Sequence, residues 1–158
     1  MEYKNETIAI EGSWNLASWE WKFESIALIR KTFEAMKNER KLMANKCPGC
    51  GRVYFLPKPY CLCLSIPDEW VEIKDTATVT TYTFTGAWAY EGIADDEVSG
   101  TPQIFAGVVF DGSDTKTVTM LEGIEPEKVH VGMRVKLKWP EEVAGGLTDL
   151  AHCVPLEE

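Results

Sequence analysis

The N-terminal part of the chain has the apolar pattern of an amphipathic helix. Large apolar side chains recur there every three or four positions, at Trp19, Phe23, Ile26, Ile29, Phe33 and Met36. This spacing places them on one face of a helix, and charged residues occupy the other faces. The face either packs on the rest of this chain or binds a partner protein, because Trp and Phe are enriched in interfaces. In the second case the expected partner-binding residues are Trp14, Trp19, Phe23 and Ile26.

The second half of the chain is expected to be β structure. Short runs rich in Thr and aromatic residues, or with apolar and basic residues in alternation, are typical of strands. The turn dipeptide Asp111-Gly112 ends one run, and Pro126 suits the first turn of a short helix. The expected strands are residues 77–84, 103–110, 116–121, 133–139 and 147–154. Five short strands with one small insertion predict a Greek-key barrel of the OB type.

Four cysteines lie between the expected helix and the expected barrel. Cys47 and Cys50 are separated by two residues and followed by Gly51, and ten residues further on comes a second pair. Two such pairs can hold one metal ion between two turns, and a glycine after the second ligand tolerates a turn with positive φ. The pattern predicts a zinc ribbon with the ligands Cys47, Cys50, Cys61 and Cys63. Since the second pair has a single residue between its thiols, a distorted site or one with only three sulfurs stays open.

Two disulfide bonds are another interpretation of the four cysteines, and they require an oxidising compartment. The first residues, Met1 to Glu6, have neither the basic start nor the apolar run of a secretory signal, so we expect a cytoplasmic protein. A thioredoxin-like dithiol needs a strand before the Cys-x-x-Cys pair and a helix after it, and prolines follow here instead. Zinc is the first choice of metal. Iron is the second, and would make the chain a rubredoxin-like electron carrier.

The net charge of −9 is spread unevenly along the 158 residues. Residues 37–60 contain six basic residues and one acidic residue, whereas residues 61–158 contain six basic and eighteen acidic ones. Zinc ribbons and OB folds both occur in nucleic-acid-binding proteins, but phosphate binding relies on many Lys and Arg side chains. The acidic C-terminal part therefore disfavours nucleic acid as a partner.

No apolar run approaches the roughly 20 residues that span a bilayer, so no membrane partner is expected.

Candidates for catalysis outside the four cysteines are few. They are His130 in the expected short helix, and His152 beside Cys153 near the C-terminus. Neighbouring side chains on a strand point to opposite faces, so His152 and Cys153 are not expected to act as a pair. A core position is the expected environment of the Cys153 thiol. The sequence therefore predicts no catalytic residue.

A series of motifs, taken in order, resembles a known family. They are the helix ending near Leu42, the first Cys pair with its Gly, the prolines Pro57 and Pro59, the second Cys pair, the lead-in Glu69 to Glu72, and the segment Gly123 to Val135. The chain resembles, over about residues 30–155, the zinc-ribbon and OB-fold proteins, long labelled a domain of unknown function, that accompany thiolases and related acyl-CoA condensing enzymes. The resemblance implies a mainly β protein with an N-terminal helical segment (1–42), a rubredoxin-like zinc ribbon (43–68) and a five-stranded OB-fold barrel (69–158).

The resemblance also implies a function. The chain is expected to be a non-catalytic subunit in a hetero-oligomer with a thiolase catalytic subunit, which cleaves a 3-oxoacyl-CoA with coenzyme A. The Trp-rich N-terminus and the short second Cys pair resemble the small subunit of a thiolase of anaerobic aromatic degradation. Coenzyme A or acyl-CoA is expected at the interface. Lys46, Arg52 and Lys58 would pair with its phosphates or with an acidic partner surface, and both interpretations stand.

Overall fold

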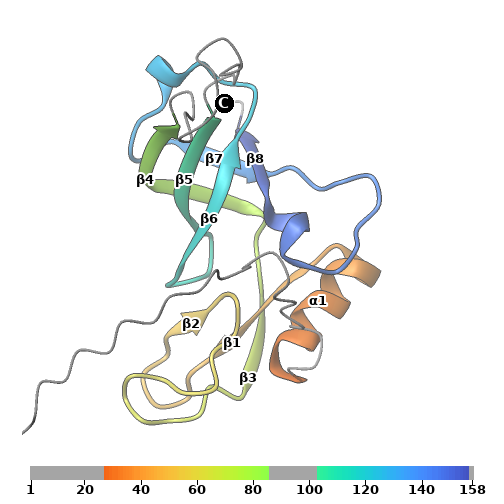
Figure 1. Cartoon of the computed structure of the whole chain (residues 1–158). Helices are drawn as coiled ribbons and strands as arrows, with labels where there is room; N and C mark the ends of the chain where they lie inside the picture. Colours follow the sequence, from red (N-terminus) through yellow and green to blue (C-terminus); the bar gives the residue numbers. More distant parts are fainter. Residues whose placement is uncertain (1–26, 86–102, 157–158) are drawn as a thin grey trace, which may run out of the picture.

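The fold is mainly β, with a helix, a small open sheet and a closed barrel (Figure 1). The computed structural model describes residues 27–85 and 103–156. This architecture confirms the expected fold class. None of the helices in these two ranges is long and apolar enough to cross a membrane. The expected partner-binding residues lie outside the described residues, so their role stays a prediction: Trp14, Trp19, Phe23 and Ile26.

Helix α1 (Ala27–Glu39) carries the described end of the apolar stripe. Phe33 and Met36 are buried, and both belong to a core that also includes barrel residues. The described part of the stripe therefore packs on this chain itself. The helix ends at Glu39, and the next residue, Arg40, has a positive φ of 53°. The Arg40 guanidinium donates to the backbone oxygens of Pro140 and Glu141, and so attaches the end of the helix to the loop that precedes the last strand.

The small sheet has three antiparallel strands in the order β2-β1-β3. Strand β1 (Leu42–Lys46) lies between β2 (Val53–Tyr54) and β3 (Glu69–Ile73). The sequence had assigned Glu69 onward to the barrel, but β3 pairs along its whole length with β1. The expected boundary between residues 68 and 69 thus falls at the first residue of a ribbon strand. A strand pattern predicts extended backbone without naming the partner strand, because strand pairing is non-local.

The barrel closes in the strand order β4-β5-β6-β8-β7, which is the OB topology expected from the sequence. All five expected runs contain strands, although the last two are shorter than expected. The segment Leu147–Leu150 forms the 3-10 turn η4 before the final strand, and Pro126–Lys128 forms the small insertion η3. The barrel strands are β4 (Thr76–Thr85), β5 (Gln103–Phe110), β6 (Lys116–Leu121), β7 (Arg134–Leu137) and β8 (His152–Pro155).

The ribbon sheet is tied to one end of the barrel by hydrogen bonds and by shared core. Val53 N–H donates to the Asp114 carboxylate at 2.8 Å, and Asp114 N–H donates back to the Val53 carbonyl at 2.9 Å. Thr115 Oγ1 both accepts from Phe55 N–H and donates to the Phe55 carbonyl, each at 3.0 Å. The Phe55 ring meets Phe110 edge-on, with 5.3 Å between ring centroids. We call these contacts, at Val53, Phe55, Phe110, Asp114 and Thr115, the ribbon–barrel strap.

Asp111 joins the end of β5 to two other barrel strands. Its carboxylate accepts two hydrogen bonds from Arg134 of β7, at 2.8 and 2.5 Å, and another from the Thr76 hydroxyl of β4. The Arg134 guanidinium, with help from Thr76, lowers the pKa of Asp111 to about 2, against burial that acts in the opposite direction. The ionised carboxylate is thus the form that this corner of the barrel requires.

We expect Asp111→Asn to lower the free energy of unfolding at pH 7. The full pKa shift corresponds to about 2 kcal/mol, and screening by solvent at this partly exposed pair reduces the expected loss to about 1 kcal/mol. Because the folded pKa is depressed, the contribution is present above pH 4 and is lost as the pH falls toward about 2. Urea unfolding of both proteins between pH 7 and pH 2 measures this. A mutant with the same acid dependence as the wild type would contradict the assignment.

Candidate metal centre

Four sulfur atoms converge from two turns at the end of the ribbon sheet. The first turn, Cys47 to Cys50, connects β1 to β2, and the second, Cys61 to Cys63, lies between β2 and β3. All four Sγ atoms lie within 4.8 Å of one another. The closest pairs are Cys47 with Cys63 and Cys50 with Cys61, each at 3.4 Å. All four expected ligands therefore meet at one point, two of them buried and two exposed.

The short second pair reaches this point through a tighter turn. In the first turn Gly51 N–H donates to the Cys47 carbonyl at 2.8 Å, which closes a turn of five residues. In the second turn Leu64 N–H donates to the Cys61 carbonyl at 2.9 Å, which closes a turn of four residues. The residue directly after the second cysteine has positive φ in both, 77° at Gly51 and 68° at Leu64. One residue fewer between the thiols is thus absorbed by a tighter turn, and the fourth sulfur is not displaced.

The two turns touch each other at Gly49. A Cβ atom on this glycine would lie 2.4 Å from Ser65 Oγ and 3.4 Å from Cys63 Sγ. The absence of a side chain therefore lets the second turn approach the first. The Ser65 hydroxyl and then the Ser65 backbone N–H lower the pKa of Cys63 by donating to its thiolate.

The pKa values of the thiols reflect how close the four sulfurs lie to one another. The Cys63 backbone N–H and then the Tyr54 hydroxyl lower the pKa of Cys61 to about 6. The backbone N–H of Arg52 acts to lower the pKa of Cys50, but the Cys61 sulfur, burial and the Cys47 and Cys63 sulfurs together raise it to about 12. Neighbouring thiols cannot all ionise without a counter-charge. A divalent cation among the four sulfurs would supply it.

Two buried residues that the sequence did not identify support the site. The Tyr54 hydroxyl lies 3.1 Å from Cys61 Sγ, where it can donate to a thiolate. The Asn45 side chain donates to the carbonyls of Lys58 and Pro67, at 2.8 and 2.9 Å, and accepts from Lys58 N–H. Asn45 thereby fastens both ends of the loop that carries the second turn. Asn45 could have been found from the sequence, because it is a polar residue in the apolar run before the first cysteine. No feature of the sequence singles out Tyr54.

These residues fit a zinc ion. Zinc in structural sites is tetrahedral with Zn–S distances of about 2.3 Å, which places the sulfurs about 3.8 Å apart. The observed sulfurs span this range. A disulfide bond requires about 2.0 Å, so the described cysteines are free thiols and the disulfide interpretation fails. Zinc would be held by Cys47, Cys50, Cys61 and Cys63, all as thiolates, in a closed site with no protein ligand to spare.

The three expected cationic residues lie around the ribbon but differ in their partners. Lys46 Nζ is 3.7 Å from a Glu69 carboxylate oxygen on the neighbouring strand. Lys58 Nζ lies 5.7 Å from the centre of the Tyr54 ring. The Tyr54 hydroxyl and the Cys50 and Cys61 thiols raise the pKa of Arg52. Arg52 and Lys58 thus lie beside Tyr54, whose hydroxyl contacts Cys61, and their charges would partly balance that of a zinc tetrathiolate.

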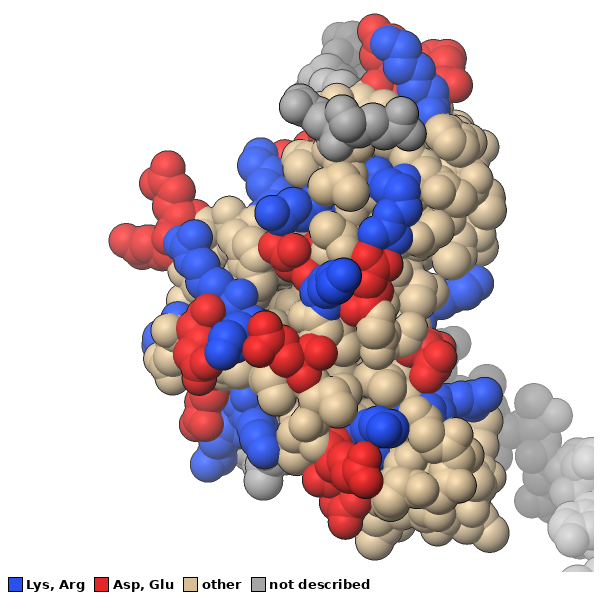
Figure 2. Space-filling model, turned by 180° about the vertical axis from the view of Figure 1, so that it is seen from behind, with Lys and Arg blue, Asp and Glu red and all other residues tan. Residues whose placement is uncertain are grey.

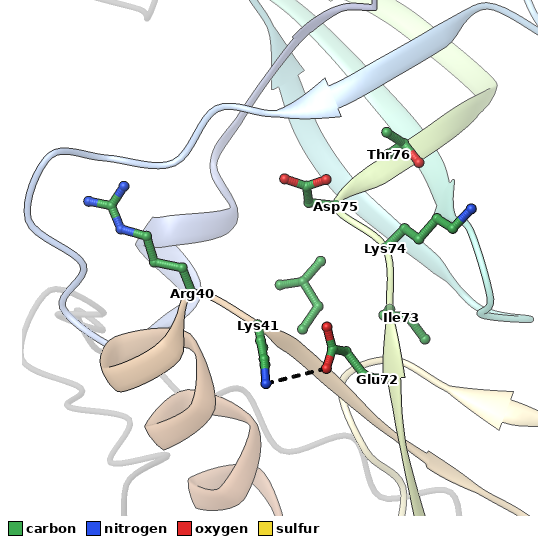
Figure 3. A pocket seen from close by; sticks show the side chains of 8 residues that line it. Arg40, Lys41, Glu72, Ile73, Lys74, Asp75 and Thr76 are labelled. Carbon is green, nitrogen blue, oxygen red and sulfur yellow. Dashed lines mark ion pairs between the residues drawn. The ribbon is translucent and has the colours of Figure 1, made fainter.

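A hollow of about 400 Å³ lies where α1 and the ribbon sheet meet the start of β4 (Figure 3). Its charged side chains have both signs, and Lys41 forms ion pairs with Glu72 and Glu39. Figure 3 shows Arg40 and Lys74 pointing away from each other. The hollow therefore offers no convergent set of cations to a phosphate group. Its lining is Arg40, Lys41, Leu42, Glu72, Ile73, Lys74, Asp75 and Thr76.

The remaining candidates for catalysis are not arranged as a nucleophile and a base. Cys153 is fully buried in the core, and burial raises its pKa to about 11. This matches the core position expected of it. His152 is on the opposite face of β8, with Nδ1 2.6 Å from Glu122. His130 is exposed and contacts the Lys128 carbonyl. Within residues 27–85 and 103–156, no thiol outside the metal centre has a histidine partner in these contacts.

We expect Cys63→Ser to weaken zinc binding at least tenfold, because the tight second turn delivers a full ligand. In the cobalt-substituted protein, the loss of one thiolate should weaken the sulfur-to-metal charge-transfer bands and shift the d–d bands. The matched control is Cys153→Ala, which removes a thiol from the core and should leave one metal per chain. A Cys63→Ser protein with an unchanged cobalt spectrum would show that this sulfur is not a ligand.

We expect Tyr54→Phe to bind zinc about tenfold more weakly, since partners of metal ligands typically contribute 10- to 100-fold in affinity. The substitution removes only the hydroxyl that faces Cys61. Competition with a chromogenic chelator measures the affinity. Tyr60→Phe removes a hydroxyl from an exposed ring and should leave the affinity unchanged. Equal zinc affinity in the two variants would contradict a role of the Tyr54 hydroxyl at the metal.

Comparisons with known proteins agree with this site. Residues 35–65 match a family model described as the rubredoxin-like zinc ribbon domain of ChsH2. A curated relative, a probable enoyl-CoA hydratase alpha subunit of Thermomonospora curvata, is 31% identical over 110 residues. The match covers 69% of this chain and 32% of the relative, so this chain spans about a third of that protein's length.

Two solved structures share the fold. The first is described as an Ltp2-ChsH2(DUF35) aldolase, with a TM-score of 0.58 and 28% identity over 82% of this chain and 94% of that chain. The second is a protein of unknown function of the DUF35 family from Sulfolobus solfataricus. It has a TM-score of 0.59 and 24% identity, over 80% of this chain and 84% of that chain, and shows likeness of fold alone. The chain is thus a zinc-ribbon and barrel protein similar in fold to the DUF35 structures, and its residues 35–65 match the zinc ribbon of ChsH2.

Proposed function

We propose that this chain is a non-catalytic, zinc-binding subunit of a complex that processes acyl-CoA thioesters. The likeness of its ribbon and barrel to ChsH2 carries the proposal, because the solved aldolase is described by two components, Ltp2 and ChsH2. The curated relative is named as a subunit of an enoyl-CoA hydratase, a name that indicates an acyl-CoA thioester as its substrate. By this analogy the present chain assembles with a separate catalytic polypeptide.

The chemistry of the described residues supports an accessory role. Thiolytic cleavage needs a thiolate activated by a base, and a second acid or base group. Four thiols of this chain are committed to one closed metal site, and the fifth, Cys153, is buried with a raised pKa. The proposal therefore places the nucleophile on the partner. Zinc, when bound, supplies structural cross-linking in such a site, without an open coordination position for substrate.

The finer proposal concerns the reaction. We propose that the partner is a thiolase that cleaves a 3-oxoacyl-CoA with coenzyme A. The Trp-rich N-terminus and the short second cysteine pair favour, within that class, cleavage of 2-benzoylsuccinyl-CoA to benzoyl-CoA and succinyl-CoA, a step of anaerobic toluene degradation. The subunit would dock on the catalytic chain and close part of the acyl-CoA site, which excludes water from the reaction.

Coenzyme A contacts belong to the same proposal. Of the three cationic residues selected from the sequence, Lys46 already faces Glu69. Arg52 and Lys58 are exposed beside the metal centre and remain available to a phosphate at the subunit interface. A contact of this kind would depend on salt, since exposed charge pairs are screened.

Two alternative functions are a nucleic-acid-binding protein and an iron-containing electron carrier. Figure 2 shows Lys and Arg interspersed with Asp and Glu on one face, rather than gathered into the basic surface that nucleic-acid binding requires. A tetrahedral four-sulfur site also suits iron, so a rubredoxin-like electron carrier has support from the geometry. A reddish protein that is bleached by dithionite would favour iron, and a colourless protein with one zinc would exclude it.

The test is an affinity purification of the tagged chain from native extract, with mass spectrometry and metal analysis of the eluate. We expect a thiolase-type protein in fixed ratio and about one zinc per chain. The purified pair should cleave 2-benzoylsuccinyl-CoA at least tenfold faster than the catalytic protein alone. Recovery of the chain alone, or with nucleic acid, would contradict the proposal, as would full activity without this subunit.

A further inference from the structure

The second cysteine turn carries a cluster of exposed apolar side chains. Tyr60 is 70% exposed, Leu62 85%, Leu64 91% and Ile66 60%. Tyr60, Leu62 and Leu64 alternate with the two cysteines of the turn, and Ile66 follows two residues after Leu64. We call these four residues the knuckle tip. In Figure 2 the ribbon end of the molecule, at the lower right, is a protruding surface largely without Lys, Arg, Asp or Glu.

Leu64 is an unfavourable residue for its backbone conformation. Its φ of 68° lies in the left-handed region, which is costly for a side chain with a Cβ atom and is normally occupied by Gly or Asn. The first turn has Gly51 at the corresponding position, with a φ of 77°. Leu64 gains nothing in return from burial, because its side chain is 91% exposed. A strained, exposed leucine indicates a role outside the fold of the isolated chain.

We propose that the knuckle tip is a docking surface that inserts into an apolar pocket of the catalytic acyl-CoA subunit. This inference rests on the proposed function, which supplies the partner. The zinc then has a second consequence, since its ligands Cys61 and Cys63 hold the tip in the shape that the partner binds. Asn45 holds both ends of the same loop through the carbonyls of Lys58 and Pro67.

The knuckle tip alone is too small to hold two copies of this chain together. Four such side chains offer on the order of 500 Å², whereas a stable interface buries about 800 Å² on each partner. Two protruding tips also cannot enclose each other. A few large apolar side chains in a concave pocket, by contrast, can supply most of the binding energy of an interface.

The charge around the tip disfavours a membrane as the occupant. Residues 59–67 contain no charged side chain, and one cation and one anion, Lys58 and Asp68, flank them. Peripheral binding to anionic lipid uses clusters of Lys and Arg beside the apolar group. This chain instead carries a net charge of −9. An uncharged apolar tip with balanced flanks suits a protein pocket.

The test compares two double variants of the full-length, zinc-loaded chain. Leu62→Ser with Leu64→Gly alters the knuckle tip, and Val131→Ser with Leu147→Ser removes exposed apolar side chains from the barrel. The probe is the purified thiolase-type subunit recovered with the wild-type chain, and calorimetry measures its affinity. We expect the tip variant to bind at least tenfold more weakly and the barrel variant to bind within twofold of the wild type.

Leu64→Gly alone separates docking from folding. Relief of the left-handed strain should raise the melting temperature by about 2–4 °C, while the loss of the side chain should weaken partner binding severalfold. A defect in folding would instead lower both the melting temperature and the affinity for the partner. Zinc content is measured for every variant and should stay at one per chain.

The remaining outcomes overturn the inference in different ways. Unchanged affinity of the tip variant overturns the docking surface and leaves the proposed function standing. A wild-type chain that binds no thiolase-type subunit removes the proposed function, and the docking inference with it. Self-association in sedimentation, or flotation with phosphatidylcholine and phosphatidylserine vesicles, that is lost in the tip variant would assign the tip to a second copy or to a membrane instead.

Discussion

The convergence of four thiolates holds together a sheet that has almost no core of its own. Strand β2 has two residues, and the separate cluster beneath the sulfurs consists of Cys47, Tyr54 and Cys61. A segment of this size cannot bury enough apolar surface to offset its conformational entropy. The free energy of metal binding therefore becomes folding free energy of the ribbon. The positions of the two cysteine turns depend on that cross-link.

The two cysteine turns solve the same geometric problem with different residues. Each must turn its backbone through positive φ directly after its second ligand. The first turn uses Gly51, which adopts this conformation without cost, and the second uses Leu64, which does not. The first turn also needs Gly49, because Ser65 occupies the space of a side chain. The metal site thus requires a positive φ after each second ligand, which a glycine provides most easily. The leucine at this position in the second turn is not required by the metal site and adds an apolar side chain to the surface.

The sequence predicted the elements better than their partners. Alternation and turn residues identified the five barrel strands, and the spacing of the cysteine pairs identified the four sulfurs that meet at one point, because these signals are local. The sequence analysis wrongly placed the strand Glu69–Ile73 in the barrel. Its pairing with β1 is a contact between distant segments, which only the tertiary structure shows. The doubt about the second cysteine pair arose from spacing alone. Spacing does not reveal that hydrogen bonding from Leu64 N–H closes a tighter turn, and it does not reveal the hydroxyl that Tyr54 directs at Cys61.

The ribbon–barrel strap means that this protein cannot be divided into two independent modules. Phe55 belongs to the ribbon loop by sequence, yet its ring packs on Phe110 of the barrel. A peptide containing only the ribbon would expose that ring to water and would leave the hydrogen bonds of Val53 and Phe55 without Asp114 and Thr115. Its zinc affinity would then understate that of the whole protein, because linkage adds the stability of the docked barrel to the metal-bound state. Metal occupancy and barrel integrity are two readouts of one cooperative unit.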